Sequence, residues 1–169
     1  MVAPIPRRLA LSLIAGAGLL PVRALGETVI DLDWADLLPP GAPEVAPVLQ
    51  SLLDHDGPAA MAASQPASSG VRHDWDGRIV RLPGFIVPLE FAGTAVSAFI
   101  LVPYVGACIH VPPPPANQLV HVTTDTPFES RSLFEAVNVT GTFRATDTAT
   151  DLAAIGYAIT AETIERYRG

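Results

Sequence analysis

The sequence contains one cysteine and no lysine in 169 residues. With a single cysteine the chain cannot form an internal disulfide, so Cys108 is a core residue, a metal ligand, a reactive thiol or a link to another chain. Signatures of common enzymes are also missing: there is no G-x-S-x-G, C-x-x-C or H-E-x-x-H motif and no glycine-rich phosphate loop. These absences favour a protein without enzymatic activity.

Positive charge is scarce. Ten arginines are outnumbered by 17 acidic residues, which gives a formal net charge of −7 at pH 7. Such a surface repels phosphate backbones and anionic lipid, so we expect no nucleic-acid partner. Hydrophobic residues make up 49% of the chain, which is enough to build the core of one domain.

The amino terminus has the organisation of an export signal. Arg7 and Arg8 precede a 14-residue apolar run, Leu9–Val22, which is too short to span a bilayer comfortably and leads to a small-residue Ala-Leu-Gly sequence. We predict that residues 1–26 are a signal peptide, removed during export to the periplasm by the Sec or twin-arginine route. The mature chain would have a net charge of −10 and no lipidated cysteine. An uncleaved membrane anchor is the alternative.

Residues 27–73 are expected to form an amino-terminal extension. They contain apolar spacing typical of a short helix over 41–53, followed by a linker rich in alanine, serine and proline. We assign no ligand role to His55 or His73, because no other ligand type accompanies them at a suitable spacing.

The remaining residues, 74–169, carry the alternating hydrophobicity of short strands. Five strands are predicted, over residues 79–89, 95–102, 119–124, 136–144 and 155–159, with a short helix over 161–168. Pro83-Gly84 and Gly141 interrupt two of these strands, and such residues typically mark the bulge or bend by which a sheet curls. The predicted fold class is therefore mainly β, a small curled five-stranded barrel of the oligonucleotide-binding type, with a β-sandwich as the alternative.

The most reactive chemistry lies in one segment, Leu101–Gln118, with the sequence LVPYVGACIHVPPPPANQ. Cys108 and His110 are two residues apart, so in an extended segment their side chains lie on the same side. His121 lies on a predicted strand between two valines, and it points outward if those valines face the core. One thiolate and two imidazoles suit zinc or cuprous copper, which makes Cys108, His110 and His121 candidate metal ligands.

Two other interpretations of these residues stay open. Structural zinc sites normally have four protein ligands, and Cys108 is equally explained as a small core residue while the histidines make ordinary polar contacts. The third interpretation is a thiol-dependent enzyme in which His110 activates Cys108.

Four consecutive prolines restrict the backbone beside the cysteine and histidine. They predict either a stiff loop, whose following amides bind a polar ligand or brace the loop, or a polyproline II arm that docks onto a partner. We favour the stiff loop with a functional edge. The residues of this edge are Tyr104, Pro112, Pro113, Pro114, Pro115, Asn117 and Gln118.

Residues 76–124 resemble a family of small exported bacterial proteins that is grouped as a domain of unknown function. The resemblance is carried by LVPYVGACIHVPPPPANQ, by RLPGFIVPLE before it, and by AVNVTGTF and GYAI after it. Members of that family resemble periplasmic proteins or lipoproteins, and some accompany ABC-type transporter components in settings linked to metal supply. The resemblance therefore implies a periplasmic location and a metal-linked role. This chain differs from the lipoprotein members because it lacks an amino-terminal cysteine.

The leading hypothesis is a soluble, non-enzymatic periplasmic accessory protein that holds zinc or a similar soft cation. Its partners would be ABC transporter components or another periplasmic protein. The alternatives are a protein-interaction module that uses the proline-rich loop, with Cys108 structural, and a thiol-dependent enzyme.

Overall fold

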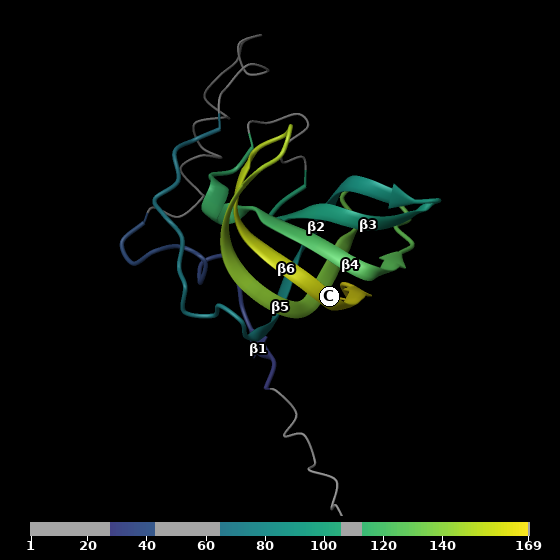
Figure 1. Cartoon of the computed structure of the whole chain (residues 1–169), viewed down its shortest axis with the longest axis horizontal. Coiled ribbons are helices and arrows are strands. Elements are labelled where there is room, and N and C mark those ends of the chain that lie inside the picture. The colour runs from purple at the N-terminus through teal and green to yellow at the C-terminus, as the bar shows by residue number, and fades with distance from the viewer. Residues whose placement is uncertain (1–27, 43–64, 106–112, 169) are drawn as a thin grey trace, which may run out of the picture.

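The computed structural model describes residues 28–42, 65–105 and 113–168 (Figure 1). These residues form a two-residue strand, five long strands and one 3-10 turn. In chain order these elements are β1 (Ile30–Asp31), β2 (Ile79–Ala92), β3 (Ala95–Val102), η2 (Ala116–Gln118), β4 (Val120–Phe128), β5 (Ala136–Ala149) and β6 (Ala154–Arg166). Most of the helix predicted over 41–53 lies outside the described residues.

The five long strands close into a barrel. Neighbouring strands follow the order β2-β3-β4-β6-β5, and β5 pairs back onto β2 to complete the circuit. The β4–β6 pair is parallel and the other four pairs of the barrel are antiparallel. This is the closed five-stranded barrel predicted from the sequence, and each long strand pairs with two others. The short β1 pairs in parallel with Val80 and Arg81, in the half of β2 that pairs with β5 and not with β3.

The predicted carboxy-terminal helix over 161–168 is wrong. Strand β6 instead continues to Arg166 and pairs with β5 along almost its whole length, from Ala154 opposite Ala149 to Arg166 opposite Val137. The alanines and glutamates of this stretch favour a helix by local propensity, but the fourteen residues of β5 provide a longer template than the apolar pattern suggested.

Apolar side chains pack on both faces of the strands. The barrel interior holds the larger cluster, which includes the fully buried Phe99, Phe143 and Tyr157. A second cluster includes the outer face of β2 and β3, where Val87, Ile100 and Val102 alternate with interior residues. We call it the outer apolar cluster, and its buried members are Val87, Ile100, Val102, Leu119, Ala153 and Ile155.

Two glycines allow the strands to approach closely enough for closure. A Cβ atom at Gly84 would lie 2.7 Å from Leu101 Cγ, and one at Gly141 would overlap the Thr160 carbonyl oxygen. A register shift in the β5–β6 pair begins at Gly141, so the predicted irregularity is confirmed there. At Pro83-Gly84, by contrast, β2 keeps its register and is uninterrupted. It changes partner one residue later, at Phe85, which pairs with both β3 and β5.

We predict that Gly141→Ala lowers the free energy of unfolding by about 2–3 kcal/mol, because the methyl group would force β5 and β6 apart. Urea titration followed by circular dichroism measures the change. Gly93→Asn is the matched control: Gly93 has a φ of 67°, which asparagine tolerates, and open space around it. If Gly141→Ala destabilised the protein no more than Gly93→Asn does, the packing argument would be contradicted.

Candidate functional site

The candidate site is built around the connection between β3 and β4. This connection leaves β3 at Val102 and reaches β4 at Val120 through the 3-10 turn η2. Three of its predicted functional residues, Cys108, His110 and Pro112, lie outside the described residues. The predicted metal site therefore rests on the sequence for these positions, whereas the structure describes His121 and both ends of the connection.

His121 points away from the barrel interior, as predicted. Val120 and Val122 on either side of it are completely buried in the barrel, so the alternation of β4 places His121 on the outer face. There it lies between Ile100 of β3 and Ala158 of β6 and is partly exposed. Its imidazole is beside the outer apolar cluster and close to the end of β4 where the connection arrives.

The outer face of β3 is covered by apolar residues. In oligonucleotide-binding barrels the second and third strands stack bases on this face, and here these strands are β3 and β4. Ile100 and Val102 occupy it and are fully buried in the outer apolar cluster, with Tyr104 and Phe134 packed against them. This face therefore differs from the base-stacking face of oligonucleotide-binding barrels, which carries exposed aromatic side chains.

The two amides predicted to bind a ligand or brace the loop do brace the chain. Asn117 and Gln118 are only 1% exposed. Asn117 Nδ2 donates to Ser69 Oγ (2.8 Å) and to the Gly70 carbonyl (2.9 Å), while Gln118 Nε2 donates to the Trp34 carbonyl (2.9 Å). The turn η2 thus fastens two stretches of the amino-terminal extension to the end of the barrel.

The carbonyl oxygens of the same amides retain hydrogen-bonding capacity. Asn117 Oδ1 and Gln118 Oε1 are buried and accept no hydrogen bond within the described part of the chain. Exchanging the amide oxygen and nitrogen of either side chain would not supply the missing partner. The nitrogens face backbone carbonyl groups, which can only accept hydrogen bonds. A buried acceptor left unpaired costs about 1–3 kcal/mol, so this end of the barrel can stabilise a water molecule or a polar ligand that donates to it.

The described part of the proline run belongs to the fold. Pro114 is buried, and its carbonyl accepts a hydrogen bond of 2.8 Å from Gln65 Nε2. Gln65 also bonds both backbone groups of Ala154 at the start of β6. Tyr104 packs its ring against the outer apolar cluster. These contacts hold the described ends of the connection against the rest of the fold.

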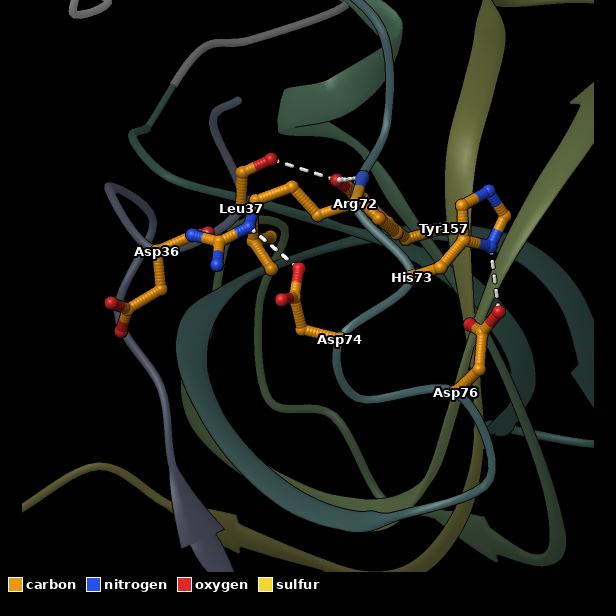
Figure 2. A network of polar contacts seen from close by, with 7 residues as sticks. All are labelled: Asp36, Leu37, Arg72, His73, Asp74, Asp76 and Tyr157. Atoms are coloured by element: carbon orange, nitrogen blue, oxygen red, sulfur yellow. Dashed lines mark hydrogen bonds and ion pairs between the residues drawn. The ribbon is translucent and has the colours of Figure 1, made fainter. Parts of the chain in front are cut away.

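A network missed by the sequence analysis joins the extension to the barrel interior (Figure 2). The Tyr157 hydroxyl, within the barrel core, donates to the Leu37 carbonyl (2.7 Å) and accepts from the Arg72 backbone N–H (2.8 Å). Burial raises the pKa of this hydroxyl, which keeps it protonated and able to donate. The Arg72 guanidinium binds Asp74 and the Asp36 carbonyl, both at 2.9 Å. A buried tyrosine normally needs a partner for its hydroxyl, which is the one signal that could have indicated this contact.

Asp76 closes the same network on the side of β5. Its carboxylate accepts the Ala145 backbone N–H at 2.6 Å and the His73 ring nitrogen at 2.7 Å. The bond from Ala145, followed by the one from His73, holds the pKa of Asp76 below its usual value. His73 therefore has a structural partner in Asp76.

We predict that Tyr157→Phe lowers the free energy of unfolding by about 1–3 kcal/mol, because the change leaves a buried carbonyl and a buried N–H without their partner. Denaturant titration measures the loss, and hydrogen exchange should show faster exchange at the Arg72 amide. Tyr167→Phe is the control, since the Tyr167 side chain is 54% exposed. Equal stability of the two variants would refute the tethering role of Tyr157.

We further predict a pH-dependent contribution from Asp76, measured as the stability difference between His73→Asn and the double variant His73→Asn, Asp76→Asn. Since the folded pKa of Asp76 is lowered, the carboxylate stabilises the fold above the unfolded pKa of about 4, and this stabilisation disappears as the pH falls through the folded pKa. A difference that stays constant from neutral pH to pH 2 would show that the charge on Asp76 is irrelevant.

Two features are absent from the described part of the chain. It contains no group of three or more His, Cys, Asp or Glu side chains placed to hold a metal ion. None of its helices is long and apolar enough to cross a membrane.

Comparison with known proteins identifies relatives without an established activity. No curated protein matches the chain. A crystal structure of a DUF3299 family protein from Pseudomonas aeruginosa PAO1 is similar, with 38% sequence identity and a TM-score of 0.68 over 84% of this chain and 98% of that one. The family model described as "Protein of unknown function (DUF3299)" matches residues 34–166. The match includes the barrel and the extension from Trp34 onward. The chain belongs to the DUF3299 family.

Proposed function

We propose that this protein is a non-enzymatic periplasmic accessory protein that binds zinc, or a similar soft cation, through Cys108, His110 and His121. The observation that carries the proposal is the outward direction of His121 on β4, at the strand end reached by the connection that contains the other two residues. A thiolate and two imidazoles form a donor set that suits zinc, and a fourth position would be left for water or for a partner.

The surroundings of His121 support a metal role better than a structural one. Within the described residues this imidazole has no hydrogen bond or ion pair that fixes it. Its neighbours across the strands, Ile100 and Ala158, are apolar. A low-dielectric neighbourhood excludes competing water and strengthens the attraction between a thiolate and a cation.

The proposal also includes export to the periplasm and a partner in a transport system. The charged, apolar and small-residue regions of residues 1–26 favour cleavage and release into the periplasm, where a single thiol has no internal partner for a disulfide. An excess of acidic over basic residues favours cationic ligands. Service to an ABC-type transport system is the role that the family resemblance suggests.

We predict that folded, metal-free protein takes up about one zinc ion per chain, that Cys108→Ser abolishes the uptake, and that His121→Asn weakens it at least about tenfold. Elemental analysis gives the stoichiometry, and cobalt substitution reports a metal–thiolate bond by its absorption. Protein released from the periplasm should begin at Glu27 and carry the ion.

The control is His73→Asn, because His73 lies on the surface and binds Asp76 instead of a site residue. It should bind zinc as the wild type does. Unchanged zinc binding by Cys108→Ser, or an equal loss in the two histidine variants, would reject the site.

A further inference from the structure

An apolar pocket of about 170 Å³ lies on the outside of the barrel, where β2 changes partner. The pocket is separate from His121 and uses none of the proposed metal ligands. Its walls come from the extension, from β2, from the first residue of β5 and from the residues directly after β3 and β6. The lining residues are Trp34, Pro83, Gly84, Phe85, Pro103, Ala136 and Tyr167.

The lining is almost wholly apolar and already fixed in place. The Trp34 indole donates its only N–H to the Pro83 carbonyl at 2.8 Å, so the ring is oriented and its polar atom is used. The Tyr167 backbone N–H donates to the Ala136 carbonyl at 2.9 Å, which anchors the tyrosine at the rim. Its side chain nevertheless remains 54% exposed. A pocket with three aromatic rings and two prolines offers packing surface rather than polar recognition.

The volume fits one side chain rather than a whole metabolite. Small-molecule sites usually enclose about 300–1,000 Å³, whereas a cavity of about 150 Å³ holds a molecule the size of benzene. A proline ring or a branched aliphatic side chain is of this size. An occupant of this kind would be the anchor of a longer partner, because one side chain alone binds too weakly for a stable complex.

Charge beside Trp34 in the chain indicates the sign of that partner. Asp33 and Asp36 lie one and two residues from Trp34, and their carboxylates accept backbone N–H bonds within this turn but form no ion pair within the described residues. Figure 2 shows the Asp36 carboxylate directed away from the Arg72 guanidinium. The other nearby acids are neutralised: Asp31 by Arg81 and Glu135 by Arg166.

The arginine next to the pocket in sequence belongs to another part of the surface. Arg168 follows Tyr167, but it lines a separate hollow with Asn138 and Glu165. The chain as a whole has 17 acidic residues and no lysine, which gives the pocket an anionic background. Long-range attraction therefore favours a basic partner.

We propose that this pocket docks a basic, proline-containing extended segment of a partner protein. Polyproline II segments bind to grooves lined by aromatic rings because they are already ordered and lose little entropy on binding. The proline would occupy the space between Trp34, Phe85 and Tyr167, and the Tyr167 hydroxyl at the rim would donate to a peptide carbonyl. Asp33 and Asp36 would attract the basic residues.

Tryptophan fluorescence tests the proposal directly, because the chain has only two tryptophans. In a Trp75→Phe background, Trp34 is the sole reporter. The probes are three synthetic peptides: Arg-Arg-Pro-Leu-Pro-Pro-Leu-Pro, the same peptide with glutamates for its arginines, and the same peptide with alanines for its prolines. The basic proline peptide should change Trp34 emission and bind at least about tenfold more tightly than either of the others, with an affinity that falls as salt rises.

Two variants locate the binding. Ala136→Leu fills the pocket from β5 and should lower the affinity for the basic peptide at least about tenfold. Ala92 is exposed at the far end of β2, so Ala92→Leu should leave this affinity unchanged. Tyr167→Ala removes an exposed side chain that lines the pocket, and it should also lower the affinity for the basic peptide. Circular dichroism confirms that each variant is folded.

Three outcomes would overturn the proposal. The first is equal binding of the acidic peptide, and the second is unchanged affinity in both Ala136→Leu and Tyr167→Ala. The third is Trp34 emission that stays unchanged with every peptide but changes with protein concentration as the chain dimerises. In that case a second copy of the chain would occupy the pocket. Zinc uptake is independent of each of these readouts.

Discussion

The whole structure depends on the double pairing of β2. Its first half pairs with β5 and its second half with β3, and Phe85 is the residue that pairs with both. This arrangement closes the sheet and buries the interior cluster, but it requires β3 to pass very close to β2. Gly84 permits that approach because no side chain stands between its backbone and Leu101. The apolar pocket lies at the same place, since Gly84, Phe85 and Ala136 all line it.

The barrel also supplies the anchors for the amino-terminal extension. Buried side chains of the barrel and of η2 bond to backbone groups of the extension: Tyr157 to Leu37, Gln118 to Trp34, and Asn117 to Gly70. Each contact satisfies a backbone carbonyl that would otherwise be costly to bury. The extension in return supplies Trp34, whose indole bonds to Pro83 of β2 and forms one wall of the pocket. Thus the extension is part of the binding surface and not only a leader to the barrel.

Sequence reasoning predicted the barrel well where burial alternates. The strand over 95–102 has the predicted bounds, and the outward direction of His121 follows from its buried neighbours. It failed at the carboxy terminus, where alanine and glutamate have a helical preference that pairing with β5 overrides. The contacts of the extension could not be predicted, because a bond such as Tyr157 to Leu37 joins residues 120 positions apart and leaves no periodic trace. The pocket was missed for the same reason, since its walls come from segments distant in sequence.

The connection between β3 and β4 is restrained at both ends, which bears on how it would bind a cation. Pro103 limits the backbone directly after β3, and Tyr104 packs onto the outer apolar cluster. At the other end, Pro114 is buried and bonded to Gln65, and η2 is held by its amides. A segment whose ends are fixed has fewer conformations to lose when a ligand orders it, so more of the interaction energy remains as affinity. Under the proposed function, three ligands that would bind a metal weakly on a flexible peptide would bind it more tightly on a connection whose two ends are already held.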